Sequence, residues 1–82
     1  MIVYGTKHCS DCHVARKTLD RLRVSYRWID LGEHPEDVPL VMELNGGNRV
    51  VPTIVFADGT VLAEPSAAEL TAAIKRLEAT NA

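Results

Sequence analysis

The residues best suited to chemistry lie in one short run, HCSDCH at positions 8–13, which contains the only two cysteines of the chain. Two cysteines in a C-x-x-C arrangement can exchange disulfides, attach haem when a histidine follows them, or supply two of the four ligands of a zinc site. The run is compatible with all three chemistries. Which of the three chemistries applies therefore depends on the helices and strands that position Cys9 and Cys12.

The dithiol interpretation depends on where Cys9 falls relative to the next helix. Helical periodicity begins near residue 11, which puts Cys9 at the helix N-terminus, where free amides and the helix dipole favour a thiolate. We therefore expect Cys9 to ionise more readily than a free cysteine and to act as the nucleophile. Cys12, one turn further on, is the resolving thiol. The Asp11 carboxylate opposes ionisation of Cys9 only if it faces the sulfur.

Three alternatives use the same cysteines to hold a metal. Haem attachment fits because His13 completes the C-x-x-C-H pattern, with Met42 or His34 as a second axial ligand. A zinc site would take its remaining ligands from His8, His13 or His34, because the second half of the usual paired spacing is absent. An iron–sulfur cluster shared by two chains would use Cys9 of each.

Strand and helix patterns alternate along the rest of the chain. Strands are predicted at 2–4, 24–30, 50–56 (interrupted by Pro52) and 60–62, and helices at about 11–23, at about 38–44 and from 66 onward. Asp58-Gly59 predicts a tight hairpin turn, and Ser66 with Glu69 predicts a capping box. Because strand–helix–strand units are parallel and tight hairpins antiparallel, the order β-α-β-α-β-β-α predicts one α/β domain over 1–82, a mixed four-stranded sheet flanked by three helices.

Each predicted helix has a face that we expect to be buried. The expected buried residues are Val14, Ala15, Thr18, Leu19 and Leu22 in the first helix, Val38, Val41, Met42 and Leu44 in the second, and Leu70, Ala73, Ile74 and Leu77 in the third. In the second strand, Val24, Tyr26 and Trp28 share one side, where we expect them to pack rather than to contact substrate.

Composition excludes several classes of function. Nine basic residues face eleven acidic ones, and no basic run is available to bind a nucleic acid backbone. The chain begins with Met1 and shows neither a secretory signal nor an apolar run long enough to span a membrane. We therefore expect a monomeric cytoplasmic protein, in which a close cysteine pair is more often catalytic or metal-binding than structural.

The motifs together resemble the glutaredoxin family, which has the thioredoxin fold. The C-x-x-C motif followed by Val51-Pro52 carries this resemblance, and the runs GNRVVPTI (47–54), FADG (56–59) and PSAAE (65–69) are similar to the mycoredoxin-like branch. The resemblance covers essentially the whole chain. It implies that Cys9 is the nucleophile, that Cys12 resolves, and that Pro52 follows a cis peptide bond with the Val51 backbone free to pair with a substrate.

Two departures from the family concern the thiol that the site binds. Thr6 stands where many glutaredoxins have lysine, and Pro65-Ser66 replaces a double glycine that helps to hold glutathione. The amides of Ser66 and Ala67 are expected to be free to bind a carboxylate, and mycothiol becomes an alternative to glutathione. The expected substrate-binding residues are Lys7, His8, Arg49, Val51, Pro52, Ser66 and Ala67.

The function that we expect is thiol–disulfide exchange that reduces mixed disulfides between proteins and a low-molecular-weight thiol, mycothiol or glutathione. No bound cofactor is required, because the external thiol, kept reduced by a flavin-dependent disulfide reductase, is the reductant. Two alternatives stay open. One is a dedicated electron donor to a reductase such as ribonucleotide reductase, and the other is an iron–sulfur cluster carrier.

Overall fold

The computed structural model describes residues 1–81. The elements in order are β1 (Ile2–Gly5), α1 (Ser10–Arg21), β2 (Arg27–Asp30), the 3-10 helix η1 (Pro35–Asp37), α2 (Val38–Leu44), β3 (Thr53–Val55), β4 (Val61–Ala63) and α3 (Ala67–Asn81). They form a four-stranded sheet in the order β2-β1-β3-β4, in which β2 is parallel to β1 and β3 is antiparallel to both of its neighbours. The predicted α/β fold class is confirmed.

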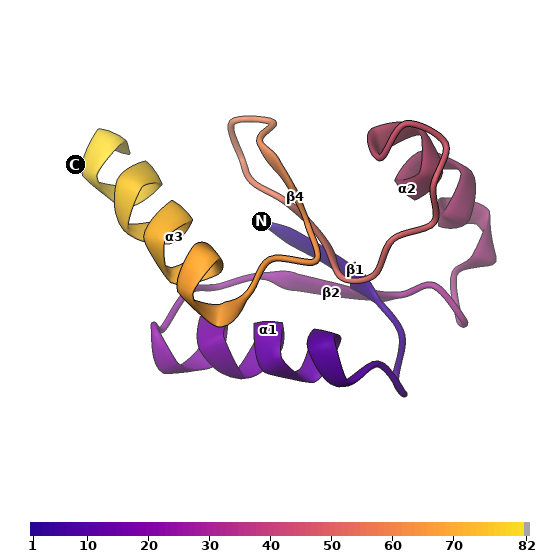
Figure 1. The fold of residues 1–82 in the computed structure, drawn as a ribbon, viewed down its shortest axis with the longest axis horizontal. Coiled ribbons are helices and arrows are strands. Elements are labelled where there is room, and N and C mark those ends of the chain that lie inside the picture. Colours follow the sequence, from indigo (N-terminus) through magenta and orange to yellow (C-terminus); the bar gives the residue numbers. More distant parts are fainter. Residues whose placement is uncertain (82) are drawn as a thin grey trace.

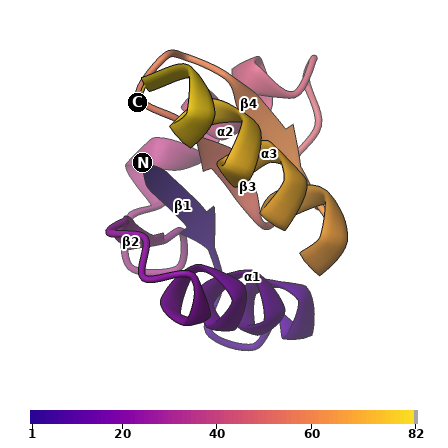
Figure 2. The same ribbon diagram turned by 90° about the vertical axis from the view of Figure 1, so that its left-hand side faces the viewer.

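Two apolar clusters attach the helices to the two faces of the sheet. The cluster on one face joins α1, through Leu19, to α3, through Leu70 and Ile74. The cluster on the other face packs Val41 of α2 against Tyr4 and neighbouring strand residues. Figure 1 shows α1 and α2 on opposite sides of the sheet, and Figure 2 shows α3 in front of β3 and β4. Within residues 1–81, no helix is long and apolar enough to cross a bilayer.

The second strand is shorter than predicted. Arg23 has a φ of 57°, and the Val24 amide donates to the Leu19 carbonyl at 3.0 Å, so the chain leaves α1 through a left-handed turn. The strand therefore begins at Arg27 rather than at Val24. The third strand is also shorter than the predicted 50–56, because Pro52 has no amide hydrogen to donate to a ladder.

The predicted buried faces are correct for α3 and partly wrong for the other helices. Leu70 and Ile74 are buried, and the hairpin predicted at Asp58-Gly59 is present, with the Phe56 amide donating to the Thr60 carbonyl at 2.8 Å. Three residues expected to be buried are instead exposed, namely Val14, Met42 and Leu44. The seven-residue α2 has only about two turns, and Val41 is the one residue of that helix that is buried.

Candidate active site

Cys9 occupies the N-cap position of α1, immediately before the helix begins at Ser10. The Cys12 amide donates a hydrogen bond to the Cys9 sulfur at 3.3 Å, where an N-cap oxygen would normally accept it. A hydrogen bond of this kind and the positive end of the helix dipole both favour negative charge on the sulfur. Cys9 is half-buried, so its sulfur is accessible for exchange.

Cys12 differs from Cys9 in both exposure and protonation. Its side chain is 1 % exposed, packed beneath the start of α1. Burial raises the pKa of the Cys12 thiol to about 12, helped by its hydrogen bond to the Cys9 sulfur and by the charges of Cys9 and Asp11, while a backbone hydrogen bond from Thr6 acts in the opposite direction. The pair therefore consists of one accessible sulfur and one buried thiol that stays protonated at neutral pH.

The segment before β3 brings a backbone carbonyl to the Cys9 sulfur. The Val51–Pro52 peptide bond is cis, as the resemblance implied. The Cys9 thiol points at the Val51 carbonyl oxygen, with sulfur and oxygen 3.9 Å apart. The Glu64 amide donates to the Pro52 carbonyl at 2.9 Å and so attaches the segment before α3 to this loop. The segment before β3 thus meets Cys9, and the segment before α3 is attached to it through Pro52.

The start of α3 is held by a reciprocal capping box. The Ser66 amide donates to Glu69 Oε1 at 3.0 Å, and the Glu69 amide donates to Ser66 Oγ at 3.1 Å. Hydrogen bonds from Ser66 hold the pKa of the Glu69 carboxyl below its usual value. The expectation that the Ser66 amide is free to bind a ligand is therefore wrong in this structure, because the chain's own carboxylate already accepts from it.

Comparison with known proteins decides the family. The family model described as Glutaredoxin matches residues 1–62. This chain belongs to the glutaredoxin family. It is also 39% identical over 75 residues to Mycoredoxin 1 of Corynebacterium glutamicum, and 35% identical over 77 residues to a protein of Mycobacterium tuberculosis that carries a glutaredoxin name. These matches cover 92% and 94% of this chain, respectively, and 92% of each relative.

The family and the C-x-x-C motif together make this protein a thiol–disulfide oxidoreductase. Glutaredoxins act on mixed disulfides between proteins and small thiols and take their electrons from an external thiol. The geometry at Cys9 and Cys12 suits this chemistry, because an accessible sulfur can attack a disulfide while a second thiol lies one helical turn away.

The other expected binding residues differ in burial and in their distance from Cys9 along the chain. Val51 and Pro52 lie beside Cys9, whereas Lys7, His8 and Arg49 are exposed. The ammonium of Lys7 pairs with Glu33 Oε1 at 2.7 Å, which raises the pKa of Lys7. Arg49 makes no hydrogen bond or ion pair within the described part of the chain.

Two residues help to shape the site through contacts that were not predicted from the sequence. His13 forms a hydrogen bond between its Nε2 and the Lys7 carbonyl at 2.9 Å, which ties the loop before Cys9 to α1. Gly5 ends β1, and a Cβ at this position would lie only 2.7 Å from the Cys12 sulfur. A glycine at the last residue of a strand, just before the reactive loop, was the signal that could have identified this close approach.

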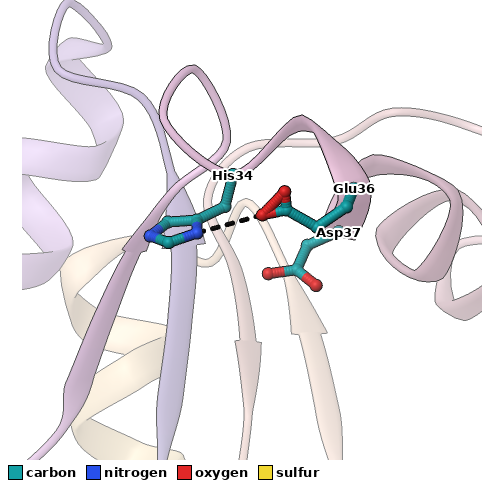
Figure 3. Close-up of side chains that lie close together, drawn as sticks. All are labelled: His34, Glu36 and Asp37. Atoms are coloured by element: carbon teal, nitrogen blue, oxygen red, sulfur yellow. Dashed lines mark hydrogen bonds and ion pairs between the residues drawn. The ribbon is translucent and has the colours of Figure 1, made fainter.

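His34, a candidate ligand in two of the metal alternatives, lies beside the carboxylates of Glu36 and Asp37. Within residues 1–81, the one group of three metal-ligating side chains consists of His34, Glu36 and Asp37, whose ligand atoms lie within 4.8 Å of one another. Figure 3 shows His34 Nδ1 paired with Glu36 Oε1 at 3.1 Å and Asp37 beside them. The group includes neither cysteine, so the structure does not assemble the zinc site that combined the histidines with the C-x-x-C pair.

Proposed function

We propose that this protein reduces mixed disulfides between proteins and a low-molecular-weight thiol, with Cys9 as the nucleophile, and that mycothiol suits its site better than glutathione. The observation that supports the nucleophile is the N-cap geometry, in which the Cys9 sulfur accepts the Cys12 amide at the end of the helix dipole. The buried Cys12 is the resolving thiol in the reduction of protein disulfides, which needs both cysteines, whereas a second small thiol can release Cys9 in the small-thiol route. The proposal places the protein in a reducing cytoplasm, as a monomer.

The exchange balances without a bound cofactor. The Cys9 thiolate attacks the small-thiol sulfur of the mixed disulfide, a new disulfide forms between the two, and the client thiolate leaves and takes up a proton. A second small-thiol thiolate then attacks the same small-thiol sulfur, which frees Cys9 and releases the symmetrical small-thiol disulfide. A flavin-dependent disulfide reductase would return that product to two thiols.

A substrate would bind across the segments that meet at Cys9. The Val51 carbonyl lies beside the Cys9 sulfur, and we propose that an extended substrate segment pairs with the Val51 backbone like an added strand. Lys7 and His8 immediately precede Cys9 in the sequence, Arg49 lies two residues before Val51, and all three are exposed, so we propose that they contact polar groups of the small thiol.

The capping box at Ser66 is the argument for mycothiol. Glutathione carries two carboxylates, whereas mycothiol is an acetylated cysteine on a sugar–inositol unit and carries none. In this structure the Ser66 amide already donates to Glu69, and the negative Glu69 lies where a ligand carboxylate would approach Ser66 and Ala67. A thiol without carboxylates avoids both the competition for the amide and the repulsion.

Turnover of the mycothiol and glutathione mixed disulfides of one small peptide, measured in parallel, tests the proposal. We expect faster turnover with mycothiol, no turnover in Cys9→Ser, and retained small-thiol turnover in Cys12→Ser. If Cys9→Ser keeps most of its rate, Cys9 is not the nucleophile.

The specificity argument has its own variants. Glu69→Ala frees the Ser66 amide and removes the charge, so we expect the ratio of glutathione to mycothiol turnover to rise. The matched control is Glu43→Ala, which removes an exposed carboxylate from α2. If the Glu69→Ala ratio equals that of Glu43→Ala, the capping box does not select the thiol.

A further inference from the structure

The side chains of the resolving cysteine and of the only tryptophan of the chain both reach the space beside Gly5. The point that a Cβ on Gly5 would occupy is 2.7 Å from Cys12 Sγ and 2.7 Å from Trp28 Cη2. The sulfur and the ring edge are therefore no more than about 5.4 Å apart, on the same side of the strand end. Sulfur about 5 Å from an aromatic ring, often at the ring edge, interacts favourably with the partial positive charge that the edge carries.

Trp28 is itself held in place from α1. The Arg16 guanidinium lies 4.3 Å from the centroid of the indole ring, and Arg16 Nε donates to the Tyr26 hydroxyl at 3.4 Å. Arg16 is one helical turn beyond Cys12 on the same helix. One end of this arrangement is thus the resolving sulfur, and the other is a cation fixed over the ring.

We propose that Trp28, held by Arg16, is a positioning residue that keeps the Cys12 sulfur directed at Cys9 and so accelerates the step in which the two cysteines join. This inference rests on the proposed function, in which Cys12 resolves the mixed disulfide. Gly5 leaves room for the sulfur, and the ring edge limits how far it can turn away. A sulfur must approach a disulfide in line, so a displacement of about 1 Å can cost up to ~100-fold in rate.

The step that Trp28 serves is the second half of protein-disulfide reduction. Cys9 is then disulfide-bonded to a client sulfur. The Cys12 sulfur forms a bond to the Cys9 sulfur, the bond between Cys9 and the client breaks, and the proton of Cys12 ends on the departing client thiolate. Two electrons pass from the cysteine pair to the client disulfide. The small-thiol route, in which Cys12 takes no part, does not need the ring.

The test compares the two routes in variants of the full chain. Trp28→Leu removes the ring, Arg16→Gln removes the cation over it, and Arg16→Lys keeps a cation. The matched control is Lys17→Gln, an exposed neighbour on α1. The measurements are reduction of an insulin disulfide, which needs both cysteines, turnover of a peptide–small-thiol mixed disulfide, which needs Cys9, and the reduction potential of the cysteine pair.

We expect insulin reduction to fall about tenfold or more in Trp28→Leu and Arg16→Gln. Small-thiol turnover should stay within about twofold of the control, Arg16→Lys should recover most of the loss, and the reduction potential should shift in the two impaired variants. The indole emission of the unmodified protein should change when the Cys9–Cys12 disulfide forms.

Three results separate failure of this inference from failure of the proposed function. If Arg16→Gln folds and reduces insulin at the control rate, the positioning role is wrong. Equal losses on both routes, with an unchanged reduction potential, would mean that the ring serves only the fold. If the unmodified protein turns over no small-thiol mixed disulfide, the proposed function itself has failed.

Discussion

Replacing Gly5 with alanine probes the packing beneath the two cysteines. The new methyl group would lie 2.7 Å from the Cys12 sulfur, 2.7 Å from Trp28 Cη2 and 2.8 Å from Trp28 Cζ3, all shorter than van der Waals contact. Overpacking of this kind costs about 1–3 kcal/mol, and the lower backbone entropy of alanine in a strand returns about 0.5–1 kcal/mol. The two ranges leave a net loss of up to about 2.5 kcal/mol, and the central value of about 1.3 kcal/mol lowers the melting temperature of a domain of this size by roughly 5–10 °C.

Thermal unfolding of a double-mutant cycle measures this clash directly. Trp28→Leu removes two of the three close atoms, so Gly5→Ala should cost less stability in that background than in the unmodified chain. Gly32→Ala is the control, because its methyl group would meet one oxygen of the Asp30 side chain at 3.0 Å at an exposed position. The packing described around Gly5 is incorrect if Gly5→Ala has the same melting temperature as the unmodified protein. It is also incorrect if the stability changes of Gly5→Ala and Trp28→Leu are strictly additive.

Two further predictions concern charge. The folded pKa of Cys12, about 12, lies above the ordinary cysteine value of 9.0, so its contribution to stability is full below pH 9 and is lost as the pH rises toward 12. Between pH 8 and pH 10.5, chemical denaturation should show a larger loss in the free energy of unfolding for the unmodified protein than for Cys12→Ala. An equal loss would contradict the raised pKa of Cys12. Glu33→Gln breaks an ion pair with Lys7 whose side chains are 59% and 64% exposed, respectively, and should change the melting temperature by less than about 4 °C. A larger drop would show that the pair holds the loop before Cys9.

The parts of the fold that could be predicted from the sequence are those governed by local chemistry. A hairpin at Asp58-Gly59 and a capping box from Ser66 to Glu69 need only the preferences of neighbouring residues, and both are present. The start of the second strand was wrong because strand-forming residues follow a left-handed turn at Arg23, a conformation that arginine rarely adopts.

In the site, too, the features set by short motifs could be predicted and those set by long-range contacts could not. The cysteine pair and the Val51-Pro52 motif are recognisable because each is a short motif. The contacts of Trp28 depend on the parallel register that pairs Val3 with Trp28 and places the ring beside Gly5. No spacing within the sequence reveals such a register. The capping box was predicted, but its consequence, that the Ser66 amide is already occupied, follows only from the geometry.

The causes of the raised Cys12 pKa also bear on when this thiol reacts. Two of them, the hydrogen bond from the Cys12 thiol to Cys9 and the negative charge of Cys9, exist only while Cys9 is free. Once Cys9 is bound in a mixed disulfide, both are removed, and burial and Asp11 remain to raise the pKa of Cys12. We therefore expect Cys12 to ionise more readily after Cys9 has reacted, so that the second sulfur is withheld from competing reactions until there is a bond for it to break.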